Sequence, residues 1–266
     1  MFLDIFQYGF MVRGMEAGII VAVIAPLIGI FLVLRRYSLI ADTLSHVSLA
    51  GIALSFLLGI NPILGALGVT ILASLGIEKL RASKKVHGET ALALFLSGSL
   101  ALAIVLLSIS HGFNTNLFNY LFGSIVTVTQ NNVYIIASLA VVVITLLMLF
   151  YKELIYTTFD EEAAKVSGIP TNIINTIFII LTAVTIALSI PIVGVLLITA
   201  LIVIPVISAL QLKKSFTATV IIAEIISMAS VISGIVLSFY LNLSTGGTIV
   251  LLMLAVFLIL FILRKK

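Results

Sequence analysis

Long apolar runs separated by short polar breaks restrict the fold of this sequence more than any other feature. A helix needs roughly 20 mostly apolar residues to cross the hydrocarbon core of a bilayer, and such runs recur along the whole chain. Of the 266 residues, 62% are hydrophobic and only 9% are charged, whereas soluble domains carry about 25% charged residues. The sequence therefore predicts an integral membrane protein, and it excludes a soluble enzyme, a disordered chain and a nucleic-acid-binding protein.

The predicted architecture is an all-α polytopic membrane protein with eight or nine transmembrane helices in a single domain, residues 1–266. The expected spans are 14–34, 38–60, 62–77, 91–109, 133–151, 173–190, 192–210, 216–240 and 247–263. The third is short, and the two that meet at Pro191 are either one bent unit or two helices. Residues 1–12 lack a basic region and a cleavage site, so we expect an interfacial segment and not a removable signal peptide.

Residues 111–132 contain an apolar stretch that is too short to span a membrane and is bracketed by asparagines. Two interpretations remain open. The stretch is either a short re-entrant or interfacial helix on the outer side, with its backbone satisfied by protein or water, or an outer loop that packs on the bundle.

The distribution of basic residues predicts the side that each loop faces. Of the 14 lysines and arginines, all but Arg13 fall in alternate breaks between the apolar runs. Cytoplasmic loops are enriched in these residues, so we expect the C-terminus in the cytoplasm and Arg13 on the outer side. This bias also explains the net charge of +4 without a nucleic-acid partner.

Four ionisable residues fall inside the predicted spans: Glu16, Asp42, His46 and Glu224. A charged side chain at the bilayer centre costs about 2.5–3.5 kcal/mol, so each of them needs a reason. We expect Glu16, near the start of its helix, to be an anchor or a helix N-terminal acid. Glu224 lies among small and hydroxyl residues, which favours a buried acid that is hydrogen-bonded to Ser or Thr, with a place in an ion path as the alternative.

Asp42 and His46 are four residues apart, which places them on one face of a helix. A carboxylate and an imidazole one turn apart can share a zinc, iron or manganese ion; the alternative is an Asp–His hydrogen bond that ties two helices together. Ser45 flanks the pair, and we group it with Glu224 as a secondary polar site. Two ligands do not make a tight metal site, so we expect two copies of the chain to face each other around one axis.

Residues 157–172, TTFDEEAAKVSGIPTN, predict a short helix in a cytoplasmic loop. Asp160, Glu161 and Glu162 complement the positive end of the helix dipole, and Gly168 with Pro170 ends the helix. The alternative is a well-capped loop helix with no further role.

These residues carry a resemblance to a known family. Glu162–Ala163–Ala164 followed by Gly168 resembles the EAA–x3–G loop by which permeases of ABC transporters dock on their ATPase subunits. The segment LRRYSLIADTLSHVSLAGIALS, which holds the Asp–His pair, is similar to the second-helix signature of the metal-ion permeases among them. Further similarity runs through NYLFGSIVTVT, PIVGVLLITALIVIP and STGGTIVL, in the same order over essentially the whole chain. The chain thus resembles the metal-ion ABC permeases, which include the bacterial zinc permeases of the ZnuB and AdcB type.

The resemblance implies a multi-pass permease subunit of the bacterial cell membrane that imports zinc, with manganese or iron as the alternatives. It implies separate ATP-binding subunits, an extracellular solute-binding protein and a second permease subunit, with a homodimer expected. It implies no permanently bound cofactor and no enzymatic activity, since ATP is bound by the partner and the chain has no GxxxxGK[ST] loop. Thr43 and Ala50 look like the zinc members, because the manganese and iron members read DAxSHAVLPG at this place.

The resemblance assigns roles to two groups of residues. The metal-coordinating positions of the family match Asp42 and His46. The ATPase-coupling positions match Asp160, Glu161, Glu162, Ala163, Ala164 and Gly168.

Two other classes of function are alternatives for this sequence. A proton-coupled secondary carrier for divalent cations would use Asp42, His46 and Glu224 as a proton relay, and dependence on an ATPase separates it from the permease. An intramembrane hydrolase would need a nucleophile and a base, but Ser45 and His46 are adjacent and point about 100° apart on a helix.

Overall fold

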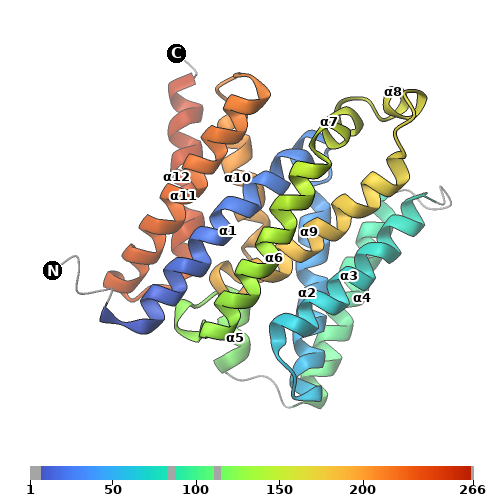
Figure 1. Cartoon of the computed structure of the whole chain (residues 1–266). Coiled ribbons are helices and arrows are strands. Elements are labelled where there is room, and N and C mark those ends of the chain that lie inside the picture. The colour runs from blue at the N-terminus through green and yellow to red at the C-terminus, as the bar shows by residue number, and fades with distance from the viewer. Residues whose placement is uncertain (1–6, 83–87, 111–114, 265–266) are drawn as a thin grey trace.

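A computed structural model describes residues 7–82, 88–110 and 115–264 of the chain, and it shows an all-helical bundle in that part (Figure 1). Eight helices are long and apolar enough to cross a membrane: α1 (Gly9–Leu34), α2 (Ser38–Leu58), α3 (Pro62–Ala82), α4 (Gly88–Ile109), α6 (Gln130–Leu149), α9 (Thr171–Val193), α11 (Phe216–Leu241) and α12 (Thr245–Arg264). The shorter elements are α5 (Thr115–Phe122), the 3-10 helix η2 (Ile125–Thr127), α7 (Tyr151–Phe159), α8 (Glu161–Val166) and α10 (Ile198–Leu210). The predicted fold class is confirmed, with eight candidate spans among the described residues.

The segment around Pro191 holds one spanning helix and one short helix, so the predicted span 192–210 is wrong. α9 continues through Pro191 to Val193, and the break falls at Gly194, whose φ is +85°. α10 has 13 residues, which is only about 20 Å of helix. The break lies at the glycine because a residue with a Cβ rarely adopts a positive φ.

The end of α3 and the start of α1 also differ from the prediction. α3 continues to Ala82 and carries Lys79 and Arg81 in its last turn, because long basic side chains can extend from a helix end to the interface. α1 begins at Gly9, so Glu16 lies two turns inside the helix and is exposed on the surface of the chain. The interpretation of Glu16 as a helix N-terminal acid is therefore wrong.

The core of the bundle lies along α1, α2 and α9. The spanning part of α9 is 83% buried inside the chain, whereas that of α12 is 22% buried. Figure 1 shows α1 and α9 crossing the middle of the molecule, with α4 and α12 at opposite sides. A helix that is apolar on all faces is a core element when protein surrounds it and a lipid-facing element when it does not, so sequence hydropathy alone does not separate the two.

Small residues set how closely α2 and α3 approach. A Cβ on Gly51 would lie 2.5 Å from the Gly65 carbonyl oxygen, and one on Gly65 would lie 2.8 Å from the Gly51 carbonyl oxygen. Ser55, one turn after Gly51, is buried in the same contact. Close backbone approach at small residues is a common way for membrane helices to associate, and here it fixes α2 in the bundle.

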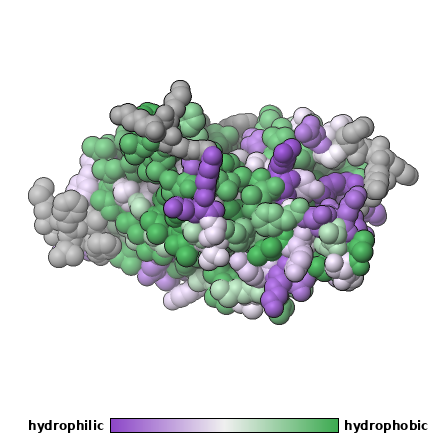
Figure 2. Space-filling model, turned by 90° about the horizontal axis from the view of Figure 1, so that it is seen from above, coloured by the Kyte–Doolittle hydropathy of each residue, from purple (hydrophilic) through white to green (hydrophobic). Residues whose placement is uncertain are grey.

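The two ends of the bundle differ in charge. At the basic end lie the α1–α2 turn, α7, α8 and the α10–α11 turn, with Arg35, Arg36, Lys152, Lys165, Lys213 and Lys214. Figure 2 looks onto this end and shows hydrophilic side chains gathered among apolar ones. The neutral end holds α5, η2 and the α2–α3 and α11–α12 turns. The positive-inside rule predicts that the basic end faces the cytoplasm.

Candidate functional site

Asp42 and His46 share one face of α2, close to the basic end. The His46 Nε2 atom lies 4.0 Å from the Asp42 Oδ1 atom. The side chain of His46 is 19% exposed and that of Asp42 is 42% exposed, so the two groups open from the bundle onto its surface. The shared face predicted from their spacing is present in the structure.

The geometry of this pair suits a shared divalent cation that is held loosely. Two ligands of a tetrahedral zinc ion lie about 3.4 Å apart, given metal–ligand distances of about 2.1 Å, so a small side-chain rotation brings these atoms into range. No group of three or more His, Cys, Asp or Glu side chains that could hold a metal occurs among the described residues. Within the described part of the chain, this pair therefore offers two donor groups, and a metal held by it would need water or another protein to complete its coordination.

Ser45 and Glu224 do not join the pair. Ser45 is fully buried, and its hydroxyl donates to the Asp42 carbonyl oxygen at 2.7 Å inside the same helix. Glu224 lies on α11, next to Ile225 and Met228. Its Oε1 atom is buried without a hydrogen-bond partner, and so is the Ser227 hydroxyl one turn away. The predicted hydrogen bond between Glu224 and a hydroxyl is therefore absent at Oε1.

The acidic loop forms α8, and both ends of this helix are capped as the sequence predicts. Asp160 is the N-cap residue, and its Oδ1 accepts a hydrogen bond from the Ala163 N–H at 2.9 Å. Gly168 has a φ of +84° and donates to the Lys165 carbonyl, while Ile169 donates to the Ala164 carbonyl. These paired bonds form a Schellman motif, so the helix begins and ends at defined residues.

α8 presents one side to the bundle and the other outward. Ala164 is fully buried, whereas Glu162 and Ala163 are exposed and Val166 is 90% exposed. Phe159, at the end of α7, is also exposed. In Figure 1, α8 lies at the basic end, beyond the ends of α6 and α9. An exposed patch that mixes apolar and acidic side chains is suited to contact with another protein.

Arg35 is a residue of this region that sequence reasoning missed. Its Nε donates to the Thr158 hydroxyl and its Nη1 donates to the Asn175 side-chain oxygen, both at 2.8 Å. Its guanidinium also lies 4.7 Å from the centre of the Phe178 ring. Burial lowers the pKa of Arg35 to about 10, so the side chain remains charged at neutral pH. In the sequence, Arg35 is one of several basic residues at helix ends, and no local pattern marks it as buried.

The predicted outer segment spans residues 111–132, of which 111–114 lie outside the described residues. The part that the structure describes contains α5 and η2. α5 and the turn after it both lie at the neutral end of the bundle (Figure 1). The last turn of α5 pairs with the break between α9 and α10: Val195 donates to the Tyr120 carbonyl, and Leu196 to that of Leu121. In the turn after α5, the Ser124 N–H donates to the Pro191 carbonyl at 3.1 Å. The short helix is thus present, and protein groups satisfy the free backbone that follows it.

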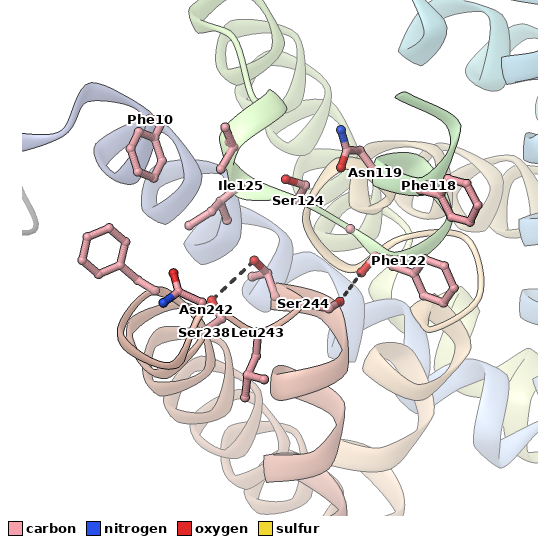
Figure 3. A pocket seen from close by; sticks show the side chains of 14 residues that line it. Phe10, Phe118, Asn119, Phe122, Ser124, Ile125, Ser238, Asn242, Leu243 and Ser244 are labelled. Atoms are coloured by element: carbon pink, nitrogen blue, oxygen red, sulfur yellow. Dashed lines mark hydrogen bonds between the residues drawn. The ribbon is translucent and has the colours of Figure 1, made fainter. Parts of the chain in front are cut away.

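A cavity of about 580 Å³ opens beside this segment. Figure 3 shows Phe118, Asn119 and Phe122 of α5 on one side of it and Asn242, Leu243 and Ser244 of the α11–α12 turn on the other. The Ser244 hydroxyl donates to the Phe122 carbonyl at 3.1 Å and ties that turn to α5. Amide, hydroxyl and aromatic groups line the cavity, and none of the described residues that line it is a His, Cys, Asp or Glu. Its donor set does not suit a transition metal.

Comparison with known proteins agrees with this architecture. The chain is 39% identical over 255 residues to a protein of Treponema pallidum named "Probable metal transport system membrane protein", covering 94% of this chain and 96% of that one. It is 30% identical to the manganese transport system membrane protein MntC of Listeria monocytogenes, covering 100% and 95%. It is 32% identical to the high-affinity zinc uptake system membrane protein ZnuB of Haemophilus influenzae, covering 88% and 90%.

A solved structure and a family model extend the comparison to the fold. The structure of PsaBC from Streptococcus pneumoniae, in complex with Fab, matches with a TM-score of 0.88 and 30% identity, covering 98% of this chain and 94% of that chain. The family model described as the ABC 3 transport family matches residues 7–264. With nearly its whole length matched, the chain belongs to the ABC 3 transport family.

Proposed function

We propose that this chain is the membrane-spanning permease subunit of an ABC importer for a divalent transition-metal ion. The observation that carries the proposal is the Asp42–His46 pair, with 4.0 Å between its nearest donor atoms, on a helix inside an apolar bundle of this family. A carboxylate and an imidazole at this separation are suitable ligands for zinc, manganese or iron. Two ligands also allow release, which transport requires.

In the proposed cycle, a solute-binding protein delivers the metal at the neutral end, which faces the outside. The ion passes the Asp42–His46 pair between two permease subunits, and a second copy of the chain supplies the other two ligands. Separate ATP-binding subunits dock on α8 at the cytoplasmic face, where Glu162 and Val166 are exposed. ATP binding and hydrolysis there select which of two packings of the helices prevails.

Zinc is the metal that we propose first, because Thr43 and Ala50 resemble the zinc members around the pair. Manganese and iron fit the same ligands, and the relatives include proteins named for manganese and for zinc. A competition assay therefore decides the metal: we expect unlabelled zinc to block uptake of labelled zinc more strongly than manganese does. A stronger block by manganese would keep the mechanism and change the substrate.

The test of the proposed function is metal uptake by cells that carry the permease with its ATPase. We expect Asp42→Ala and His46→Ala each to abolish uptake. Ser45→Ala is the matched control, since its hydroxyl bonds only within the helix, and it is expected to keep wild-type uptake. Full uptake by the Asp42→Ala/His46→Ala double variant would reject this pair as the metal site.

The same assay separates the permease from a proton-coupled carrier. We expect uptake to stop when the ATPase partner is inactivated and to persist when the proton gradient is collapsed while ATP is maintained. The reverse pattern would favour the carrier, with Asp42, His46 and Glu224 as its proton relay.

A further inference from the structure

We propose that Arg35 is a positioning residue that transmits movement of α8 to the start of α2, and so to the Asp42–His46 pair. This inference rests on the proposed function. It assigns a transport role to a partly buried cation in the turn between α1 and α2, a residue outside both the metal pair and the docking surface.

Three hydrogen bonds hold the Arg35 guanidinium against α7 and α9. The Nε and Nη1 atoms bind the Thr158 hydroxyl and the Asn175 side-chain oxygen, and Nη2 donates to the Leu154 carbonyl at 3.3 Å. The plane of the group also lies over the Phe178 ring. A fork that uses each of its nitrogens and also stacks on a ring follows rigidly any movement of the elements that hold it.

Asn175 extends this contact to α8. Its side-chain nitrogen donates to the Glu161 Oε1 at 3.4 Å, while its oxygen accepts from Arg35. The same Glu161 oxygen lies 3.0 Å from the Lys165 ammonium, one turn along α8. A continuous chain of polar contacts therefore runs from the outward-facing helix α8 through Asn175 to Arg35.

On its other side, the turn that contains Arg35 is fixed to the start of α2. Tyr37, two residues after Arg35, is the N-cap residue of α2 and donates its backbone N–H to the Leu32 carbonyl at 2.8 Å. The Tyr37 hydroxyl accepts a hydrogen bond from Arg81. Glu78 binds Arg81 through both carboxylate oxygens, at 2.9 Å each.

The three-residue turn is therefore held by the α7–α9 side at Arg35 and by α3 at Tyr37. Asp42 lies just over one helical turn after Tyr37 on α2. A displacement of α8 that pulls on Arg35 must move the first turn of α2 or break a partly buried, charge-assisted contact. Breaking such a contact is costly because the cation would remain partly buried without its partners. We therefore expect the first turn of α2 to move, while the Gly51–Gly65 contact holds the middle of the helix in place.

The experiment uses the assembled transporter in proteoliposomes, with its ATPase and metal-loaded binding protein. The readouts are metal transported per ATP hydrolysed and stimulation of ATP hydrolysis by the loaded binding protein. We expect Arg35→Gln and Arg35→Lys both to assemble with the ATPase and to hydrolyse ATP at the basal rate. Both should lower the transport-to-hydrolysis ratio by about 5- to 150-fold, the usual range for coupling between sites. Lysine should not restore the ratio, because one ammonium group cannot replace a planar guanidinium that donates from three nitrogens and lies over a ring.

Arg36→Gln is the matched control. It removes the same charge one residue further along the chain, and the side chain of Arg36 is exposed. We expect it to keep the wild-type ratio. A wild-type transport-to-hydrolysis ratio in Arg35→Lys would overturn the inference, and so would an equal loss of this ratio in Arg36→Gln. Either result would mean that Arg35 serves only as a positive charge that orients the chain in the membrane. A wild-type complex without ATPase-dependent uptake would instead reject the proposed function itself.

Two further variants keep the test valid if the Arg35 variants do not fold. Asn175→Leu and Thr158→Val each remove one acceptor and leave the arginine in place. We expect each to lower the ratio in part, and the double variant to lower it further. Wild-type coupling in the double variant would overturn the inference.

Discussion

At the scale of single residues, Asp160 shows how one side chain defines the surface that α8 presents. Its carboxylate caps the helix by accepting the Ala163 N–H, and the helix it starts is only six residues long. A helix this short has little stability of its own. The direction in which Glu162 and Val166 point therefore depends on the caps at either end.

The capping role of the Asp160 side chain can be separated from the effect of its charge. Asp160→Ala removes the cap, which costs about 1 kcal/mol, and we expect it to weaken binding of the ATPase subunit about fivefold, by the same free energy. Asp160→Asn removes the charge but keeps a capping oxygen, so it should bind nearly as the wild type. Affinity of the solubilised permease for its ATPase is the measurement, and equal weakening in both variants would assign the effect to charge.

At the scale of elements, the junction between α5 and the α9–α10 break depends on glycine. Gly194 and Gly168 have nearly the same positive φ, +85° and +84°. A Cβ on Gly194 would lie 2.4 Å from the Gly123 nitrogen and from the Leu121 carbonyl oxygen. A Cβ on Gly168 would have no atom within 4 Å. The two positions share a positive φ, but the ψ of Gly194 is 158°, a combination that is essentially confined to glycine. They also differ in their surroundings.

This difference predicts unequal effects of the same substitution. Gly168→Ala should cost about 1–2 kcal/mol, the strain of a left-handed backbone. Gly194→Ala should cost about 1–3 kcal/mol of backbone strain, because its conformation is essentially confined to glycine, and a further ~1–3 kcal/mol of overpacking, with a correspondingly lower melting temperature. Thermal unfolding of the two variants in the same detergent checks this, and equal melting temperatures would mean that the α5 junction opens without cost.

At the scale of the whole molecule, orientation in the membrane can be tested directly, because the chain contains no cysteine. Leu243 and Leu212 are exposed in the turns at opposite ends of α11. We expect a membrane-impermeant maleimide to label Leu243→Cys in intact cells and Leu212→Cys only after permeabilisation, because the positive-inside rule predicts that the basic end faces the cytoplasm. Neither change alters charge, so topology itself is undisturbed. Labelling of Leu212→Cys in intact cells would reverse the orientation.

Much of this architecture could be predicted from local patterns. Long apolar runs predict most of the spanning helices, and the DEEAAK segment with Gly168 predicts a capped α8. The spacing of Asp42 and His46 predicts their shared face, since four residues make about one helical turn. In each of these cases, the property depends on residues that are near one another in the sequence.

The sequence by itself determined that this chain is a helical membrane protein with an Asp–His pair and a capped acidic helix, because hydropathy, helical period and capping act over a few residues. Tertiary structure alone decided that Gly194, and not Pro191, ends α9, and that Glu224 lies apart from the Asp42–His46 pair. It also decided that Arg35 is buried against Thr158 and Asn175, more than 100 residues away along the chain. Such contacts depend on which helices pack together, and apolar helices of similar composition do not encode their neighbours locally.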